Sequence, residues 1–252
     1  MTNIPALINA NAERWRNMRL DNTRVPAFQS TAARLCAPVP KARFQEVTTA
    51  LVKAGYSAVP WWFVAVVAER EYGGPPHWDK QLGQGDPLDQ VSHNDPAGRG
   101  PFRQGPPPDD PWLRCCLDAL IDCAPHAALW NDWTSGGTMT LWEEYNGLGY
   151  AARGVPSAYV WSGTDQYVSG KYVADHEYRA NVKDVQEGCA PILDEMMILD
   201  RSIQFAQAPG KVIVPSPVSP VTPVKPSIQI VPPVHVAQGG LVSELLDAFR
   251  RL

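Results

Sequence analysis

The feature that most constrains the fold of this chain is an apolar segment, residues 59–68, which continues as far as Tyr72. Pro60 suits the first turn of a helix, where its missing N–H and fixed φ angle cost nothing. From residue 61 to residue 72 the segment is apolar on nearly every side of a helix, and such a helix has to be buried. The sequence therefore predicts a buried helix over residues 61–72, ended by two consecutive glycines.

Glu71 lies at the C-terminal end of this predicted helix, just before a polar stretch rich in Gly, Pro and Asp. Burial disfavours a charged carboxylate, and so does the negative end of the helix dipole. A carboxyl group that is protonated at neutral pH is a general acid, which cleavage of a glycosidic bond requires. Glu69 points about 200° away from Glu71 on a helix, so at most one of the two faces a given cleft. The alternative is that both are surface charges at a helix end.

Size and composition define the broad class of the protein. The 252 residues, 44% of them hydrophobic, are enough for one sizeable core or two small ones. The formal net charge is −4 without an extended basic run, which argues against nucleic acid as a main partner because phosphate binding needs clustered Lys and Arg. The apolar segment is too short to span a bilayer, so we expect no integral membrane segment. Residues 1–15 lack the pattern of a secretory signal, so we expect synthesis in the cytoplasm without a signal peptide.

The five cysteines do not form a recognisable framework. Their odd number argues against a secreted disulfide scaffold. Cys115, Cys116 and Cys123 lie close together near His126, but an adjacent pair with a wide gap to the third thiol fits zinc poorly. The sequence favours buried free thiols and predicts no metal site.

Helical periodicity recurs along the chain and predicts a mainly α fold. Further helices are expected over residues 44–54, 112–123, 139–145 and 182–205. Residues 73–111 contain 16 Gly and Pro in 39 positions, and a loop this long is usually functional or disordered; short β-hairpin pieces are compatible with it. The expected organisation is an N-terminal helical extension packing on the core (1–42), a main domain (43–206), a Pro-rich linker (207–238) and a C-terminal amphipathic helix (239–252).

The C-terminal segment is expected to act as a docking element. Eight prolines in residues 209–233 indicate an extended linker. Val242, Leu245, Leu246 and Phe249 then follow the spacing of one helix face. We expect the helix to dock on its own domain, to mediate self-association or to lie on a membrane surface. Membrane binding is the least favoured of these hypotheses because the apolar face is short.

Several motifs occur in an order that resembles a family of bacterial and phage lysozyme-like proteins. The buried segment reads PWWFVAVVAERE over residues 60–71. It is followed by GDPL (85–88), PAGR (96–99), LDAL (117–120), YNGLGY (145–150), YVWSG (159–163) and GKYVAD (170–175). The resemblance covers roughly residues 43–195. It implies a lysozyme-like domain with a long cleft loop, and hydrolysis of peptidoglycan.

The resemblance also implies roles for individual residues. In the wider lysozyme superfamily the acid is often the Glu of a Glu-Ser pair at the end of this helix; the match falls on Glu71, with Tyr72 in place of the serine. For a second catalytic carboxylate we favour Asp86, with Asp79 and Asp95 as alternatives, although an Asx turn before Pro87 would also explain Asp86. An inverting enzyme holds its two carboxyl groups about 6.5–9.5 Å apart.

Aromatic residues in the second half of the chain suit stacking against sugars, although such residues more often form the core or the wall of a cleft. The segment that begins at Tyr145 is similar to the Tyr-Asn-Ala-Gly element of lytic transglycosylases, which lies close to the acid and the sugar. The predicted substrate-binding residues are Tyr145, Asn146, Tyr150, Trp161 and Tyr172.

The resemblance thus implies an N-acetylmuramidase, with no metal or cofactor, that acts on peptidoglycan at the bacterial cell wall. A missing signal suits a phage endolysin that reaches the wall through a separate membrane protein. One alternative is a lytic transglycosylase, which needs no second carboxylate because the substrate's acetamido group stabilises the developing charge. The other is a non-catalytic wall-binding or virion structural protein.

Overall fold

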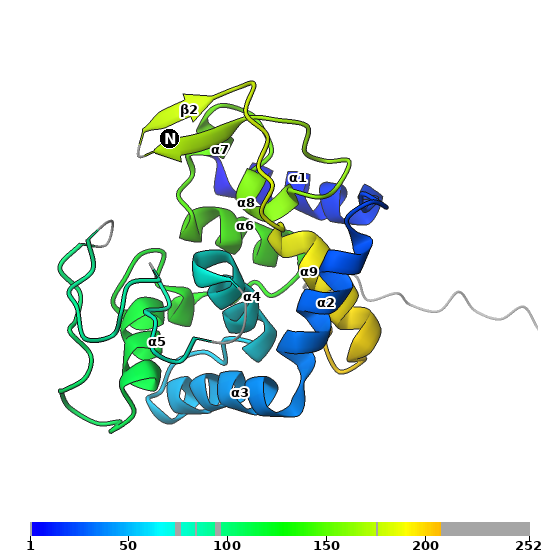
Figure 1. The fold of residues 1–252 in the computed structure, drawn as a ribbon. Coiled ribbons are helices and arrows are strands. Elements are labelled where there is room, and N and C mark those ends of the chain that lie inside the picture. The colour runs from blue at the N-terminus through cyan, green and yellow to red at the C-terminus, as the bar shows by residue number, and fades with distance from the viewer. Residues whose placement is uncertain (1, 74–76, 84, 94–96, 175, 208–252) are drawn as a thin grey trace, which may run out of the picture. The chain divides into compact units, whose positions relative to one another are not determined.

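The computed structural model describes residues 2–73, 77–83, 85–93, 97–174 and 176–207, and these form a mainly helical unit with one small sheet (Figure 1). The expectation of a mainly α fold is confirmed. The helices are α1 (Ile4–Asn17), α2 (Val25–Cys36), α3 (Pro38–Lys53), α4 (Trp61–Tyr72), α5 (Pro111–Ile121), the 3-10 turn η1 (Ala127–Leu129), α6 (Ser135–Tyr145), α7 (Gly149–Ala152), α8 (Ala158–Trp161) and α9 (Cys189–Leu199). The strands are β1 (Lys171–Ala174) and β2 (Glu177–Arg179), which pair antiparallel.

Helix α4 is the core element around which the others pack. Its bounds are those predicted, and its residues from Trp62 to Ala68 are at most 4% exposed. Each large apolar side chain buried in this way contributes about 1.5–3 kcal/mol. The helix ends at Gly73, whose φ of +58° is a conformation that favours glycine.

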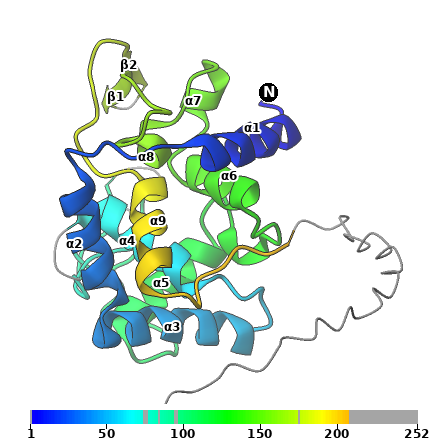
Figure 2. The same cartoon turned by 90° about the vertical axis from the view of Figure 1, so that its right-hand side faces the viewer.

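The surrounding helices cover α4 from several directions (Figures 1 and 2). Helix α3 packs on α4 and α5, and α9 packs on α2, α4 and α8. Helix α6 reaches α4 through Phe63 and Trp142, whose rings stack with centroids 5.4 Å apart. No side of α4 is left to solvent along its apolar length, which is what its sequence requires.

The N-terminal helices are part of this packing. Helix α1 lies along α6, and α2 contributes Phe28, Ala32 and Leu35 to the buried residues. Helix α3 begins at Pro38 and runs through the boundary expected after residue 42. The expected Pro-rich linker and C-terminal helix lie outside the described residues, apart from residue 207.

Three local features differ from the sequence-based expectation. The β-hairpin lies at residues 171–179, in a stretch outside the long loop, whereas the described part of that loop has only the isolated bridge between Lys80 and Pro87. The helix expected from residue 182 begins only at Cys189. Helix α6 begins earlier than expected, at Ser135, where the side chain of Thr134 caps it by accepting a hydrogen bond from the amide of Gly137. Gly136 lets α1 approach closely, since a Cβ there would lie 2.3 Å from the backbone oxygen of Ile8.

The long loop is folded against α5 rather than extended. The amide of Gln81 donates to the oxygen of Asp86 at 2.7 Å, and that of Phe102 donates to the oxygen of Leu88 at 2.7 Å. The side chains of Leu82, Leu88 and Phe102 are buried. The amide of Leu82 donates to Cys115 Sγ at 3.4 Å, which joins the described part of the loop to α5.

None of the helices in the described ranges combines the length and apolar character needed to cross a membrane.

A buried carboxyl group joins α1 to α6. Glu143 is 1% exposed, and its Oε1 accepts a hydrogen bond from Asn11 at 3.2 Å. Asn11 also donates to Thr140 and accepts from Arg14. Burial raises the pKa of Glu143 to about 7, although the hydrogen bond from Asn11 and the charge of Arg14 act in the opposite direction.

This raised pKa has a consequence for stability. The folded state binds the proton of Glu143 more tightly than the unfolded chain, so its contribution is present in full below about pH 4.5 and is lost as the pH rises through about 7. As the pH rises from 5 to 8, the free energy of unfolding of wild type should fall because Glu143 ionises. In Glu143→Gln, whose side chain stays neutral, this fall should be smaller by on the order of 2 kcal/mol. Urea unfolding at several pH values measures this.

The control is Glu46→Gln, because Glu46 is an exposed carboxylate on α3. It should show the same pH dependence as wild type. Identical slopes for Glu143→Gln and wild type would contradict the assignment.

Candidate active site

Glu71 lies at the last turn of α4, where the buried helix meets the polar loop. Its side chain is partly buried, and desolvation raises the pKa of its carboxyl to about 7. A hydrogen bond from Tyr159 and the charge of Arg70 lower the pKa but do not outweigh the burial. Near neutral pH a large fraction of the group is therefore protonated, and the protonated form is the one that a general acid requires.

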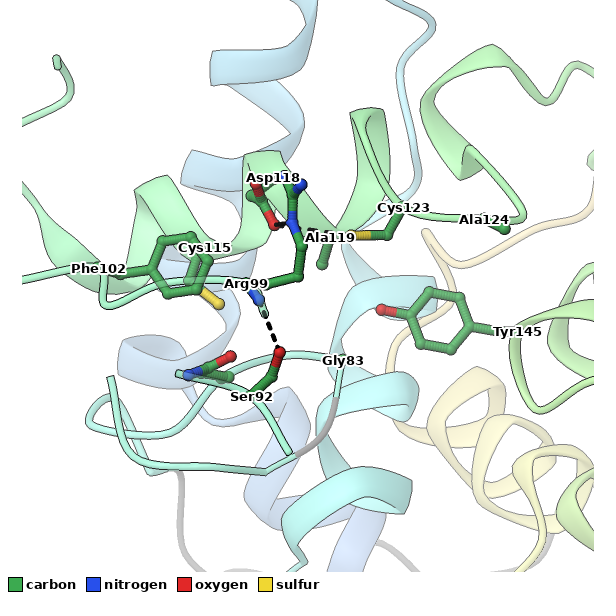
Figure 3. Close-up of a pocket in the computed structure, with 11 residues that line it drawn as sticks. Gly83, Ser92, Arg99, Phe102, Cys115, Asp118, Ala119, Cys123, Ala124 and Tyr145 are labelled. Atoms are coloured by element: carbon green, nitrogen blue, oxygen red, sulfur yellow. Dashed lines mark hydrogen bonds and ion pairs between the residues drawn. The ribbon is translucent and has the colours of Figure 1, made fainter. Parts of the chain in front are cut away.

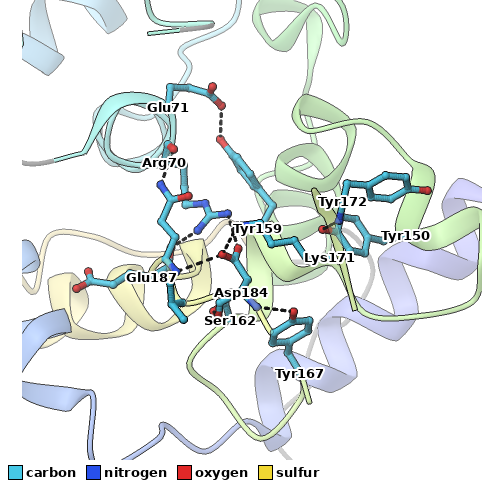
Figure 4. Close-up of polar contacts among 12 residues, drawn as sticks. Arg70, Glu71, Tyr150, Tyr159, Ser162, Tyr167, Lys171, Tyr172, Asp184 and Glu187 are labelled. Atoms are coloured by element: carbon cyan, nitrogen blue, oxygen red, sulfur yellow. Dashed lines mark hydrogen bonds and ion pairs between the residues drawn. The ribbon is translucent and has the colours of Figure 1, made fainter. Parts of the chain in front are cut away.

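The hydroxyl of Tyr159 donates a hydrogen bond to Glu71 Oε1 at 2.9 Å (Figure 4). Tyr159 belongs to the short helix α8, 88 residues further along the chain, and its ring is buried. Oε1 is thereby held as an acceptor. While Tyr159 donates to Oε1, Oε2 is the oxygen that can carry the proton of the protonated form.

Glu69 has a different environment from Glu71. Its carboxylate pairs with Arg34 of α2 at 2.8 Å, and its side chain is 12% exposed. The two carboxylates therefore contact different parts of the fold, as their angular separation on the helix predicted.

A pocket lies between the long loop, α5 and the end of α6 (Figure 3). Its lining residues are Gln81, Gly83, Ser92, Arg99, Phe102, Cys115, Asp118, Ala119, Cys123, Ala124 and Tyr145. Its wall carries the ion pair of Arg99 and Asp118, in which Arg99 Nε donates to Oδ2 at 2.9 Å. The lining thus combines charged and hydroxyl groups with apolar surface, which suits a ligand that is polar at its edges.

Tyr145 connects the pocket to Glu71. Glu71 itself does not line the pocket, but Tyr145 does, and burial and the charge of Glu71 both raise the pKa of the Tyr145 hydroxyl. The loop also approaches the backbone at the end of α4, because a Cβ at Gly85 would lie 3.0 Å from the backbone oxygen of Glu71. A ligand in the pocket would therefore lie close to the end of α4.

The predicted second carboxylate, Asp86, is engaged within the loop. Its Oδ2 accepts a hydrogen bond from the backbone amide of His93, and its Oδ1 lies 3.1 Å from His93 Nδ1. Of the alternatives, Asp79 is 82% exposed at its side chain and lies 3.8 Å from His77, whereas Asp95 lies outside the described residues.

The other predicted substrate-binding residues lie in different surroundings. Asn146 is exposed just after α6. Trp161 is fully buried and Tyr150 is 4% exposed, so both rings belong to the core. Tyr172 of β1 is partly buried, its ring centroid 5.1 Å from that of Tyr150, and its hydroxyl accepts a hydrogen bond from Arg153.

Two charged residues near the site were missed by sequence reasoning. Arg70 is 8% exposed and pairs with Asp184, which is 2% exposed and also pairs with Lys171 (Figure 4). Arg70 follows directly on Glu69 in the matched motif, so its position was visible, but its partner lies 114 residues away. Nothing near Asp184 in the sequence indicates this contact.

The cysteines are free thiols, as the sequence favoured. Four of them are buried and Cys36 is partly exposed. Burial raises the pKa of Cys115 to about 12 and that of Cys123 to about 11, so the two thiols that line the pocket are neutral at physiological pH.

Comparison of the chain with models of protein families, with curated proteins and with solved structures found no match.

The contact of Tyr159 with Glu71 can be tested by titration. A hydrogen bond to the charged form favours that form, so Tyr159→Phe should raise the pKa of Glu71 above about 7. A hydrogen bond to a charged group contributes about 1.5–3 kcal/mol, which corresponds to a shift of about one to two pH units. The midpoint is measured by NMR on protein with ¹³C-labelled glutamate carboxyl groups, with the Glu71 signal assigned from Glu71→Gln.

Tyr150→Phe is the matched control, because the Tyr150 hydroxyl contacts the backbone of Tyr172 rather than a carboxylate. It should leave the Glu71 midpoint unchanged. An unchanged midpoint in Tyr159→Phe would show that the hydrogen bond does not act on Glu71.

Proposed function

We propose that the protein cleaves the glycan strands of peptidoglycan, as an N-acetylmuramidase that breaks the β-1,4 bond between N-acetylmuramic acid and N-acetylglucosamine. Glu71 protonates the leaving oxygen. The observation that carries the proposal is a carboxyl group with a pKa of about 7 at the end of a buried helix, held at one oxygen by Tyr159 and close to Tyr145 of the pocket.

The choice of substrate is supported by the ordered motifs that resemble lysozyme-like proteins and by the nature of the pocket. A sugar has polar edges and apolar faces, and the lining offers groups of both kinds, including the Arg99–Asp118 pair, Phe102 and Tyr145. The proposed fold identity is a lysozyme-like domain. The proposed place of action is the bacterial cell wall, after synthesis in the cytoplasm.

The setting of Asp86 favours a second candidate reaction. Because the carboxylate of Asp86 is bound to His93, it is less suited to activating water than a carboxylate that faces a ligand. A lytic transglycosylase uses the substrate's acetamido group instead and requires Glu71 alone. In that reaction the same Glu71 acts first as acid and then as base, and the product is the anhydro sugar.

The deciding experiment digests purified peptidoglycan with wild type, Glu71→Gln and Glu69→Gln, followed by mass analysis of the fragments. Loss of the general acid should lower the rate about 10²–10⁴-fold. Glu69→Gln is the matched control on the same helix, since it removes a carboxylate that pairs with Arg34, and it should keep most of the activity. A product lighter by one water identifies the transglycosylase.

The pH dependence gives a further check of the same acid. Because Glu71 must be protonated to act, kcat should fall as the pH rises through about 7. Equal activity of wild type and Glu71→Gln would rule out Glu71 as the acid. No cleavage by either protein, with binding to peptidoglycan retained, would favour the non-catalytic wall-binding role.

A further inference from the structure

Arg70 is held firmly on the buried side of the proposed acid. Its Nη1 donates to the backbone oxygen of Glu187 at 2.6 Å, and its Nη2 lies 3.3 Å from Asp184 Oδ2. The backbone oxygen of Arg70 accepts a hydrogen bond from the Gln186 side chain at 2.6 Å. Residues 184–187 thus fix both the guanidinium and the backbone of Arg70.

The guanidinium lies over the ring of Tyr159, with Cζ 4.6 Å from the ring centroid. A cation in this position is attracted to the face of the ring and limits how the ring can tilt. The hydroxyl at the far end of that ring is the group that donates to Glu71 Oε1 (Figure 4). The contact of Arg70 with the ring therefore reaches the proposed acid through Tyr159.

Asp184 anchors Arg70 to the hairpin side of the fold. Its Oδ1 accepts from Lys171 Nζ at 2.8 Å, its backbone oxygen accepts from Ser162, and its backbone amide donates to the hydroxyl of Tyr167. Burial would raise the pKa of Asp184, but the hydrogen bond from Lys171 and the charge of Arg70 outweigh it and hold the pKa below its usual value. Asp184 is therefore ionised at neutral pH and forms ion pairs with both Arg70 and Lys171.

We propose that Arg70 and Asp184 are positioning residues for the proposed acid: the guanidinium, anchored by Asp184, fixes the ring of Tyr159 so that its hydroxyl stays on Oε1 of Glu71 and the transferable proton stays on Oε2. This inference rests on the proposed function of Glu71. It assigns the network of Figure 4 a part in the reaction without placing it in contact with the substrate.

The groups that face Glu71 come from four elements: Arg70 of α4, Tyr145 of α6, Tyr159 of α8 and Cys189 of α9. Burial raises the pKa of both tyrosine hydroxyls and of the thiol, so these three groups are neutral at neutral pH. Among these groups, Arg70 supplies the charge that acts on Glu71. Its removal therefore takes away a nearby positive charge and the support of the Tyr159 ring.

The first test is the NMR titration of Glu71 in the absence of substrate, with Arg70→Met and Arg70→Lys. Arg70→Met should raise the Glu71 midpoint, because both the charge and the held hydroxyl are lost. Arg70→Lys keeps the charge but lacks the planar fork that reaches Glu187 and Asp184 together, so it should raise the midpoint less. Arg34→Met is the matched control, since Arg34 pairs with Glu69 of the same helix, and it should leave the midpoint unchanged.

The second test is kinetic. A small misplacement of a catalytic group can cost about 10²-fold, so Arg70→Lys should lower kcat by 10- to 100-fold with little change in KM. In Arg70→Met the fall of kcat with rising pH should move to higher pH, which a loss of folded protein would not cause. Full rescue of kcat by Arg70→Lys would reduce Arg70 to a source of charge and overturn its positioning role.

Arg70→Met leaves the charge of Asp184 buried with one fewer partner, so its folding has to be checked by thermal unfolding. The double variant Arg70→Gln/Asp184→Asn replaces the ion pair with two neutral amides. It is titrated in place of Arg70→Met if that single variant does not fold. The inference is overturned if the Glu71 midpoint of Arg70→Lys and of the double variant equals that of wild type. A wild type that cleaves no peptidoglycan overturns the proposed function instead, and the titration still decides whether Arg70 holds the carboxyl.

Discussion

The burial of α4 is the physical constraint on which the rest of the structure depends. A helix that is apolar on every side gains stability only if other elements cover every side, and α3, α6 and α9 do so. The same burial that stabilises the apolar part of the helix opposes ionisation at its end. It raises the pKa of Glu71 and requires a partner for the guanidinium of Arg70. The core and the proposed chemistry therefore have one physical origin.

The three ionisable residues at the end of α4 have two kinds of partner. Glu69 and Arg70 form ion pairs with residues of distant segments, Arg34 and Asp184. Glu71 has a hydroxyl as its hydrogen-bond partner, and this leaves its proton affinity high. An opposite charge in direct contact would have held the carboxyl ionised, so the choice of a tyrosine as its partner is what leaves it able to act as an acid.

The proposed reacting group lies on a packed helix, whereas part of the pocket is formed by a loop. Glu71, Tyr145 and Tyr159 belong to packed helices, and Tyr145 is the one of the three that lines the pocket. Another part of the lining comes from the long loop, which is held together by backbone hydrogen bonds and by the Asp86–His93 contact. A reacting group on a buried helix keeps its position, since its neighbours are close-packed. Substrate contacts on a loop can differ between related proteins without disturbing that position.

The sequence by itself determined the bounds of α4, the placement of Glu71 at its end, the mainly α class of the fold and the free state of the thiols. These follow from local rules, because helical periodicity, glycine termination and residue composition can be read within a few turns of the chain. The sequence did not determine where the hairpin forms, which aromatic rings are core groups, or that Tyr159 and Asp184 face the end of α4. Those contacts join residues 88 and 114 positions apart. They exist only because α8 and the segment before α9 pack against the same helix, which no local pattern encodes.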